Sequence, residues 1–504
     1  MSEAQDTNTL KARRFGIDTQ HETMAFVRDD CPVCRSEGFS AHSRVRLQNG
    51  DHAIIATLYH VSPELLGRDE IGLSESAWAR LETKPGAPLA VSHPAPLNSL
   101  ADVRAKIFGQ HLGNDTALEI ISDIVEGRYS DIQICAFVTA CAALPLDLDE
   151  TTALTRAMVE TGEKIAWPNT PIVDKHCVGG LPGNRTTPII VAIAAAHGLT
   201  MPKTSSRAIT SPSGTADTME VLTRVDLDLS EMRHVVETEG GCFVWGGSMQ
   251  FSPSDDAMIR IERALDLDSQ GTLIASVLSK KIAAGATHLI IDIPVGPTAK
   301  VRSPEAAIAL QQSFIPIGEQ FGIKVQVEMT DGSQPVGRGI GPALEARDVL
   351  AVLRGDDGAP NDLRDRACQL AGSLLELVGK APEKQGTLMA RATLDSGDAW
   401  HKFKAICQAQ GGFETPPSAK HTRPILAARA GHVAAIDNRR LAKAAKLAGA
   451  PEDKAAGIDL HVRLGDVVNK GDTLYTLHTE SAGELAYAIE YIAANPGIID
   501  LTSP

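Results

Sequence analysis

Asp174-Lys175-His176-Cys177-Val178-Gly179-Gly180-Leu181-Pro182-Gly183-Asn184-Arg185-Thr186-Thr187 is a glycine-rich segment that leads directly into a helical pattern at residues 188–197. A glycine-rich turn at the start of a helix presents backbone N–H groups beside the positive end of the helix dipole, and Lys175 adds a full charge. Thr187 is a good N-cap, and Pro188 suits the first helical position. The spacing fits neither the Walker loop nor the dinucleotide fingerprint. The segment therefore predicts an anion site, with phosphate as the expected ligand.

Length and composition describe an ordinary globular protein. The 504 residues are enough for about three or four domains, and 22% of them are charged and 43% hydrophobic. The net charge of −15 excludes a general nucleic-acid binder, which needs a basic face to replace counterions. An anion must therefore be bound by local cations such as Lys175.

The sequence gives no sign of a membrane segment or a secretory signal. The longest apolar run, at residues 188–196, is too short to span a bilayer, and residues 1–14 are polar and charged. The eight cysteines are widely spread and suit a reducing compartment. We therefore expect a cytoplasmic protein that has no contact with a membrane.

Cys31-Pro32-Val33-Cys34 is the one close cysteine pair. Such a pair can be half of a zinc site or a redox pair. No second pair or neighbouring histidine cluster supplies the missing ligands. We therefore expect two thiols in a surface turn and no metal site.

The N-terminal region is predicted to be rich in β-structure. Residues 43–47 alternate, residues 49–51 form a hairpin-type turn, and residues 53–61 are β-branched and apolar. Four prolines and a glycine at residues 85–96 predict a linker. We expect a domain of its own at residues 1–95.

A helical segment follows, and after it strand and helix alternate. Apolar residues recur every three to four positions at residues 118–125, 132–139 and 151–162, and Ser130 and Gln133 have capping-box spacing. Strands are expected at residues 288–293 and 323–328, and helices at residues 273–283 and 343–353. This order predicts a helical domain and then an α/β domain with a largely parallel sheet.

Three further features of this region suit a ligand site. A second polar turn at residues 201–217 carries Lys203, Arg207 and many hydroxyls, and it leads into a helix expected at residues 218–223. Ser276 and Lys280 are four positions apart and share a helix face. Lys300 follows the end of a strand, where open α/β sheets place ligand contacts.

The C-terminal region is predicted to be a small α+β domain. Short strands divided by Gly-Asp turns occur at residues 457–479, and the stretch at residues 432–448 precedes them. These strands also suit a small all-β tail.

Taken in order, these segments resemble the thymidine phosphorylase family, whose fold is shared with anthranilate phosphoribosyltransferase. The resembling segments lie within residues 95–480 and are Leu154-Thr155-Arg156-Ala157-Met158, Thr161-Gly162-Glu163, residues 174–180, Leu278-Ser279-Lys280-Lys281, residues 330–353 and residues 465–471. The segments at residues 203–211 and 214–218 resemble the longer, second type of the family more closely. That type includes the AMP phosphorylases and has an extra N-terminal domain.

The resemblance implies an architecture of four domains and a homodimer or higher homo-oligomer. The nucleoside phosphorylase and phosphoribosyltransferase-like part would consist of a helical domain and a parallel-sheet α/β domain, which binds phosphate. The expected domains are N-terminal β-rich, helical, α/β and C-terminal α+β, at residues 1–95, 96–165 plus 250–284, 166–249 plus 285–420, and 421–504.

The resemblance also implies the roles of individual residues. Asp268 would give a proton to the leaving base, and Lys175 and His176 match the Lys-His pair of the family's motif. Ser276 and Lys300 would hold the nucleotide or base, and Lys280 matches a lysine that contacts the base. The phosphate and the sugar phosphate would be lined by Gly180, Ser206, Arg207, Ala208, Ile209, Thr210, Ser211 and Thr215.

The implied reaction explains these residue types. Phosphorolysis of an N-glycosidic bond places positive charge on the sugar and negative charge on the departing base, so it needs an acid near the base and an aligned phosphate dianion. To donate, Asp268 must keep its proton, which requires burial or a carboxylate neighbour. His176 can be a second acid or an orienting core histidine.

The expected function is conversion of thymidine and phosphate to thymine and 2-deoxy-α-D-ribose 1-phosphate, with phosphate as co-substrate and no cofactor. The alternative is phosphorolysis of a nucleoside 5′-monophosphate to a base and ribose 1,5-bisphosphate. Cys177, where the family commonly has serine, and Arg260, one place from a base-reading arginine, both count against thymidine.

Two other functions are less favoured. A phosphoribosyltransferase would use diphosphate and Mg²⁺, for which Asp255-Asp256 is the one acidic pair in the relevant segment. A lipoyl-like carrier or interaction module at residues 457–479 lacks an obvious lysine for modification, and it would leave both anion-suited turns unexplained.

Overall fold

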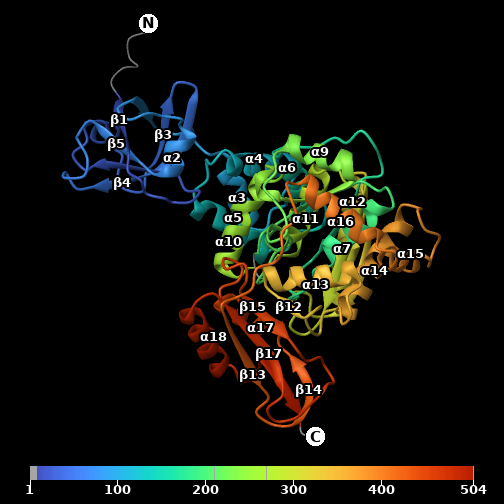
Figure 1. Ribbon diagram of the computed structural model, residues 1–504. Coiled ribbons are helices and arrows are strands. Elements are labelled where there is room, and N and C mark those ends of the chain that lie inside the picture. Colours follow the sequence, from blue (N-terminus) through green and yellow to red (C-terminus); the bar gives the residue numbers. More distant parts are fainter. Residues whose placement is uncertain (1–7, 209–210, 268, 503–504) are drawn as a thin grey trace. The chain divides into compact units, whose positions relative to one another are not determined.

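Figure 1 shows the computed structural model, which describes residues 8–208, 211–267 and 269–502. Contacts divide the chain into two compact units. The first consists of Met1–Leu144 and Asp256–Leu267, and the second of Pro145–Asp255 and Asp268–Pro504.

The first unit begins with a closed barrel of strands in the order β1-β5-β2-β4-β3-β6. β3 and β4 form the predicted hairpin, with Asn49 opposite His52. Alternate side chains such as Val45 and Leu47 fill the barrel core because successive residues of a strand point to opposite faces. The elements are β1 Thr9–Arg14, β2 Met24–Arg28, α1 Pro32–Glu37, β3 Arg44–Asn49, β4 His52–Val61, β5 Glu70–Leu73, α2 Glu75–Arg80 and β6 Pro88–Ser92.

The predicted linker at residues 85–96 is wrong in part, because Pro88–Ser92 is strand β6. It pairs with both β1 and β3 and so closes the barrel. The prolines did not prevent a strand, since Pro88 is its first residue and the other three lie outside it.

The expected surface turn at Cys31 and Cys34 is also wrong. The two residues are 0% and 2% exposed, and Cys31 immediately precedes α1. Both thiols belong to the barrel core. In the part of the chain that the structure describes, no group of three or more His, Cys, Asp or Glu side chains is placed to hold a metal ion.

The helices that follow the barrel in the sequence of the first unit have the predicted periodicity. They are α3 Ser99–Ile107, α4 Asn114–Val125 and α5 Asp131–Ala143. The predicted capping box of Ser130 and Gln133 is present at the start of α5. Helix α10, Pro253–Leu265, begins in the second unit and ends in the first, where Arg260 lies 2.7 Å from Asp131 of α5.

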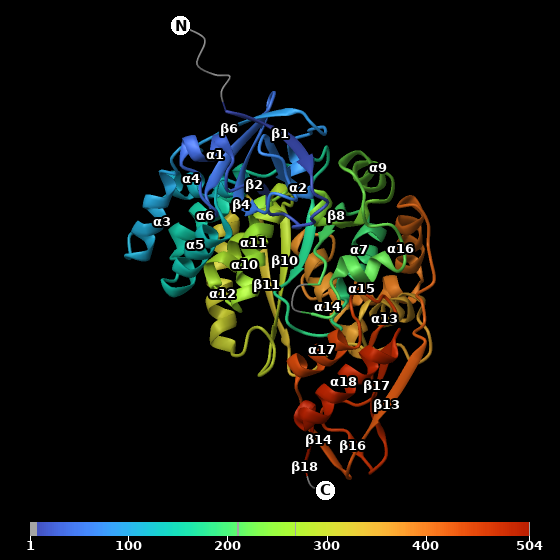
Figure 2. The same cartoon turned by 90° about the vertical axis from the view of Figure 1, so that its left-hand side faces the viewer.

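The α/β part of the second unit is built on parallel strands, as predicted. β11, β10 and β7 form one sheet, β8 and β9 pair separately, and a parallel bridge from Ile172 to Thr200 connects the two sets. Figure 2 shows β10 and β11 with α11 and α12 on one side and α7 and α14 on the other. The strands are β7 Val173–Cys177, β8 Met201–Ser205, β9 Gly241–Trp245, β10 His288–Val295 and β11 Lys324–Asp331.

Both faces of this sheet are covered, which explains the continuous apolar run in β10. Leu289, Ile291 and Ile293 pack in the core that contains α11 and α12, and Ile290 packs in the core that contains α7. Asp292 interrupts the run and is 0% exposed. A charged residue in such a place needs partners.

The predicted helices of this unit are present, but four of them begin two or three residues earlier than predicted, at Leu148, Thr186, Thr215 and Gln270. α7 begins at Thr186 with Arg185 as N-cap, so the predicted cap at Thr187 is wrong, and α8 begins at Thr215 rather than at residue 218. The helices are α6 Leu148–Glu160, α7 Thr186–Ala196, α8 Thr215–Glu220, α9 Leu229–Glu239, α11 Gln270–Ala283, α12 Pro304–Gln320, α13 Pro342–Arg354, α14 Asn361–Leu377, α15 Gly386–Asp395 and α16 Asp398–Ala409.

The C-terminal part has the predicted α+β character. One sheet has the order β12-β15-β17-β13, a second has the order β16-β14-β18, and both contribute to a common core with the two helices α17 and α18. The elements are β12 Gly339–Ile340, β13 His421–Leu426, β14 Gly431–Ile436, α17 Asn438–Leu447, β15 Gly457–Leu460, β16 Val467–Val468, β17 Thr473–Thr479, α18 Ala482–Ala494 and β18 Ile499–Thr502. Among the helices that the structure describes, none has the length and apolar character to cross a membrane.

Candidate active site

A buried ion pair joins β7, β10 and the first turn of α7. Lys175 is 1% exposed; its Nζ donates to Thr186 Oγ1 at 2.9 Å and lies 3.4 Å from Asp292 Oδ2. The other carboxylate oxygen of Asp292 accepts a hydrogen bond from Thr330 Oγ1 at 2.7 Å. Lys175 is thus fixed at the anion-suited segment from which the site was predicted.

Asp174, the preceding residue, is shared by two lysines. Lys203 Nζ lies 2.8 Å from one carboxylate oxygen, and Lys281 Nζ lies 2.6 Å from the other. Burial alone would raise the pKa of Asp174, but the two ammonium groups outweigh it and hold the pKa below its ordinary value. Asp174 therefore stays ionised and ties β7 to β8 and α11.

Ser276 and Lys280 lie together on α11, as their spacing predicts. Lys280 Nζ is 3.2 Å from Ser276 Oγ and 2.7 Å from the buried carboxylate of Asp255. The four lysines of this region (Lys175, Lys203, Lys280 and Lys281) face three aspartates (Asp174, Asp255 and Asp292). With all four lysines protonated, one excess positive charge remains in a largely buried place, which favours binding of an anion. Burial lowers the pKa of Lys203 to about 7, so this excess decreases as pH rises through that value.

His176 belongs to the same cluster. Burial lowers its pKa well below the ordinary value, and all four lysines add to the effect, with Lys281 and Lys203 acting most strongly. The imidazole is therefore neutral at physiological pH when the site is empty. It can donate or accept a hydrogen bond there, but it does not carry a proton ready for transfer.

The second polar turn is held in place by Asp217 of α8. One Asp217 oxygen accepts from the backbone N–H of Ala208 and from that of Gly214, each at 2.7 Å. A Cβ on Gly214 would lie 2.4 Å from the carbonyl oxygen of Ser206, so only glycine allows the two ends of the turn to meet. Asp217 thus holds Ala208 and Gly214 close together.

The predicted residues of this turn have different positions. Ser206 is exposed, and Ser211 Oγ donates to the Ser213 carbonyl at 2.8 Å. Arg207 pairs with Glu220 through both terminal nitrogens, at 2.9 and 2.8 Å, so a carboxylate already compensates its positive charge. Two further predicted residues, Ile209 and Thr210, lie outside the described residues, as does Asp268.

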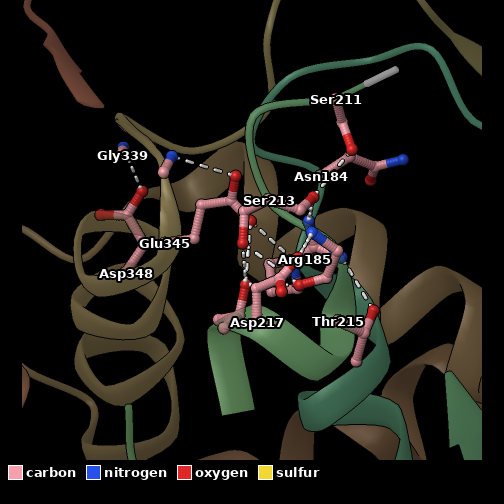
Figure 3. A network of polar contacts seen from close by, with 12 residues as sticks. Asn184, Arg185, Ser211, Ser213, Thr215, Asp217, Gly339, Glu345 and Asp348 are labelled. Atoms are coloured by element: carbon pink, nitrogen blue, oxygen red, sulfur yellow. Dashed lines mark hydrogen bonds and ion pairs between the residues drawn. The ribbon is translucent and has the colours of Figure 1, made fainter. Parts of the chain in front are cut away.

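Arg185 connects this turn to the glycine-rich segment, and its role was not predicted. Its three nitrogens donate to Thr215 Oγ1 at 2.8 Å, to the Ser213 carbonyl at 2.7 Å and to Glu345 Oε2 at 2.7 Å (Figure 3). Because Arg185 is next to Thr186, the partner of Lys175, the two anion-suited turns adjoin.

Glu345, the carboxylate behind Arg185, is 1% exposed. It also accepts from Thr218 Oγ1 and from the backbone N–H of Gly341, both at 3.2 Å. Burial raises its pKa to about 7 although Arg185 opposes the shift. Glu345 lies 160 positions from Arg185 in the sequence, so no local pattern could have indicated the pair.

Ser205 is a second residue that the sequence did not single out. Its hydroxyl is buried at the end of β8 and has no hydrogen-bond partner among the described residues. A buried hydroxyl without a partner costs free energy unless a ligand or water completes it. The run of hydroxyls at residues 204–206 was a signal for such a site, but it did not identify the residue.

Gly180 and Lys300 are in direct contact. Gly180 has φ +77°, and a Cβ there would lie 2.8 Å from the Lys300 backbone nitrogen. The glycine-rich segment therefore packs against the turn after β10, which places Lys300 beside it. Of the predicted site residues, the structure places Lys175, His176, Ser276 and Lys280 in one cluster and Gly180 in contact with Lys300. Ser211 and Thr215 are connected through Ser213 and Arg185. Arg207 pairs with Glu220 instead.

Known families and relatives match the chain over nearly its whole length. The helical bundle domain of a glycosyl transferase family matches residues 103–162, its a/b domain matches residues 169–400, and the pyrimidine nucleoside phosphorylase C-terminal domain matches residues 432–498. A protein of Maricaulis maris named "Putative thymidine phosphorylase" is 58% identical over 99% of this chain and 96% of its own length. One of the same name from a Polaromonas species is 58% identical over 96% and 95%.

This chain belongs to the thymidine phosphorylase family. It is accordingly a pentosyltransferase of the nucleoside phosphorylase type, as expected. The crystal structure of anthranilate phosphoribosyltransferase from Thermus thermophilus matches 61% of this chain and 98% of that chain, with a TM-score of 0.51 and 22% identity. That likeness confirms the predicted fold class.

Proposed function

We propose that this member of the thymidine phosphorylase family converts thymidine and inorganic phosphate to thymine and 2-deoxy-α-D-ribose 1-phosphate. The observation that carries the proposal is the excess positive charge around Lys175, whose Nζ contacts the Thr186 hydroxyl, together with the unpartnered Ser205 hydroxyl at the end of β8. The names of the relatives supply thymidine as the nucleoside.

In the proposed reaction a phosphate oxygen attacks C1′ of the sugar while the bond from C1′ to the base nitrogen breaks. The electron pair of that bond leaves with the base, which then takes a proton. Fixed donors hold the phosphate dianion without reorganisation. Lys175 supplies a charge and Ser205 an unused hydroxyl, while neutral His176 supplies a hydrogen bond.

Ser276, Lys280 and Lys300 are assigned to the nucleoside. Lys280 is already paired with Asp255 and contacts Ser276, so its ammonium group is held in one place and can donate to a carbonyl oxygen of the base. Asp268 is proposed as the group that gives its proton to the base. His176, whose pKa is lowered, suits that task less well.

One observation favours a nucleoside 5′-monophosphate as the second candidate. The donors form two adjoining sets, one around Lys175 and Thr186 and the other around Arg185 and Thr215. One phosphate needs one set, so the second set suits a 5′-phosphate on the substrate. The product would then be ribose 1,5-bisphosphate.

The test is to incubate the protein with phosphate and, separately, with thymidine, uridine, AMP and CMP, and to follow the free base by chromatography. Thymine from thymidine supports the first candidate, and base from AMP or CMP alone replaces it with the second. The Lys175→Met variant is the matched control, because it keeps the length of the side chain and removes the charge. If no substrate yields free base, or if the Lys175→Met variant releases base as fast as the wild type, the proposed function is wrong.

The reaction as proposed consumes phosphate as a co-substrate and needs no cofactor. A homo-oligomeric state, a cytoplasmic location and the four-domain division stay predictions.

A further inference from the structure

The first unit contains a cavity of about 400 Å³ that the reaction does not use. This volume lies within the range of about 300–1,000 Å³ that is typical of small-molecule sites. Its walls come from the barrel, from residues 93–97 and from helices α3 and α5. The lining residues are Gly38, Phe39, Ser43, Arg44, Ile55, His93, Pro94, Ala95, Pro96, Leu97, Leu100, Arg128 and Gln133.

The charged residues of this lining are cationic. It contains two arginines and a histidine, and no Asp or Glu is among the described residues that form it. This composition is unusual in a chain with a net charge of −15. Glu37 lies 3.5 Å from His93, so the positive charge of the cavity comes from the two arginines.

Arg44 is the cation whose charge is least compensated. Its terminal nitrogens donate to Thr57 Oγ1 and to the carbonyl of Gly127, both at 2.9 Å, and neither acceptor is ionised. Its Nε is buried and has no hydrogen-bond partner in the described part of the chain. Burial lowers the pKa of Arg44, and the opposing effect of the Glu22 and Asp131 carboxylates is smaller.

Arg128, on the same wall, is different. Its terminal nitrogens pair with Asp123 at 3.0 Å and with Glu126 at 2.6 Å, which compensates its charge. Its Nε is also buried without a partner. Two guanidinium groups thus each keep one unused N–H donor, although most buried donors in proteins are satisfied.

The rest of the lining is apolar and aromatic. The rings of Phe39 and His93 pack at a centroid distance of 4.4 Å, and Pro94, Leu97 and Leu100 complete that part of the wall. A flat ring is a good partner for such a surface. Bare phosphate would leave it unused.

We propose that this cavity binds a small organic anion with a planar ring, of the nucleoside monophosphate class, whose phosphate contacts Arg44 and Arg128 and whose base lies against Phe39 and His93. The site is distinct from the active site, because every lining residue belongs to the first unit and the lysine network belongs to the second. The ligand links the barrel to the helices of its own unit.

The experiment uses the full-length chain and the photoreactive probe 8-azido-AMP, with the labelled peptides mapped by mass spectrometry. We expect label within residues 93–104, and we expect excess AMP to remove it and an equal concentration of adenosine, which has no phosphate, to leave it. The Arg44→Gln variant should weaken protection by AMP at least about tenfold, since a hydrogen bond to a charged group is lost. Arg104→Gln on α3 is the matched control, because Arg104 is exposed and outside the lining.

Because Arg44 also supports local structure, its replacement could affect folding as well as binding. A second variant therefore blocks the cavity by volume and leaves Arg44 unchanged. Leu100→Trp fills the cavity, leaves Arg44 in place and should abolish the label at residues 93–104. Both cavity variants should keep the phosphorolysis rate, since neither residue is in the active site. Label that is confined to the second unit, or label at residues 93–104 that survives both variants, would overturn the proposal.

Discussion

Replacement of Arg185 by methionine should reduce stability by an amount that grows with pH. Arg185 is the ionic partner of Glu345, which is 1% exposed and has a pKa raised by burial to about 7 from an ordinary value of 4.5. Without the guanidinium group the pKa of Glu345 must rise further, because burial then acts unopposed. Glu345 therefore stays protonated in the variant to a higher pH than in the wild type.

The sign and size of the effect follow from proton linkage. A carboxyl group with a raised folded-state pKa makes a protein less stable as pH rises from the unfolded-state pKa to the folded-state pKa, after which the loss is complete. For wild-type Glu345 that window runs from about pH 4.5 to pH 7, and the loss is about 3 kcal/mol. In the variant the loss continues above pH 7. The difference in free energy of unfolding between the two proteins should therefore widen by about 1–2 kcal/mol from pH 7 to pH 8.5 if the pKa of Glu345 in the variant lies above this range.

A second, pH-independent part of the gap comes from the bonds of Arg185 to Thr215 and Ser213, at about 1 kcal/mol each. The assay is urea denaturation followed by circular dichroism at pH 6, 7, 8 and 8.5. The control compares the double variant Arg185→Met/Glu345→Gln with the single variant Glu345→Gln. Because neither has an ionisable group at position 345, their difference in free energy of unfolding should not change with pH. A constant gap between wild type and Arg185→Met would refute the assigned ionisation of Glu345.

Three further outcomes are expected. Ser205→Ala should raise the KM for phosphate about tenfold with little change in the KM for the nucleoside, since the hydroxyl has no protein partner to lose; steady-state kinetics with each substrate varied would measure both constants. Lys280→Met should lower kcat/KM for the nucleoside by at least about tenfold and leave Asp255 unpaired, and an unchanged ratio would remove Lys280 from the base site. Gly214→Ala should lower the melting temperature by several degrees because the new Cβ meets the carbonyl of Ser206 at 2.4 Å, whereas Gly113→Ala, at another helix N-cap with similar backbone angles and its nearest atom at 3.9 Å, shows the backbone effect alone.

The fold was largely predictable because its strands and helices are locally consistent. The continuous apolar run of β10 and the three-to-four periodicity of α4, α5 and α11 gave the right elements within a few residues. The prolines around β6 misled because they look like a linker, and only the closure of the barrel, which is not a local property, makes Pro88–Ser92 a strand. The burial of Cys31 and Cys34 likewise depends on packing of the barrel.

The site was predictable only where its residues are neighbours in sequence or share a helix face. Ser276 and Lys280 are four apart on α11 and do lie together. The link between Arg185 and Glu345 spans 160 positions and depends on how α13 packs beside α8. Residue types alone could not assign Arg207 to Glu220 rather than to a ligand.

The segment Asp174–Thr187 was expected as a turn, yet its first part belongs to strand β7, Val173–Cys177. The error and the site have the same physical origin. A strand buried on both faces is normally recognised by its apolar side chains, and here Asp174, Lys175 and His176 replace them. Such a substitution costs free energy unless each charge finds a partner, and Lys203, Lys281 and Asp292, from three other elements, supply these partners. A polar stretch that forms a buried strand is therefore stable only as part of an assembled charge cluster, and the excess positive charge of this cluster makes it a site for an anion.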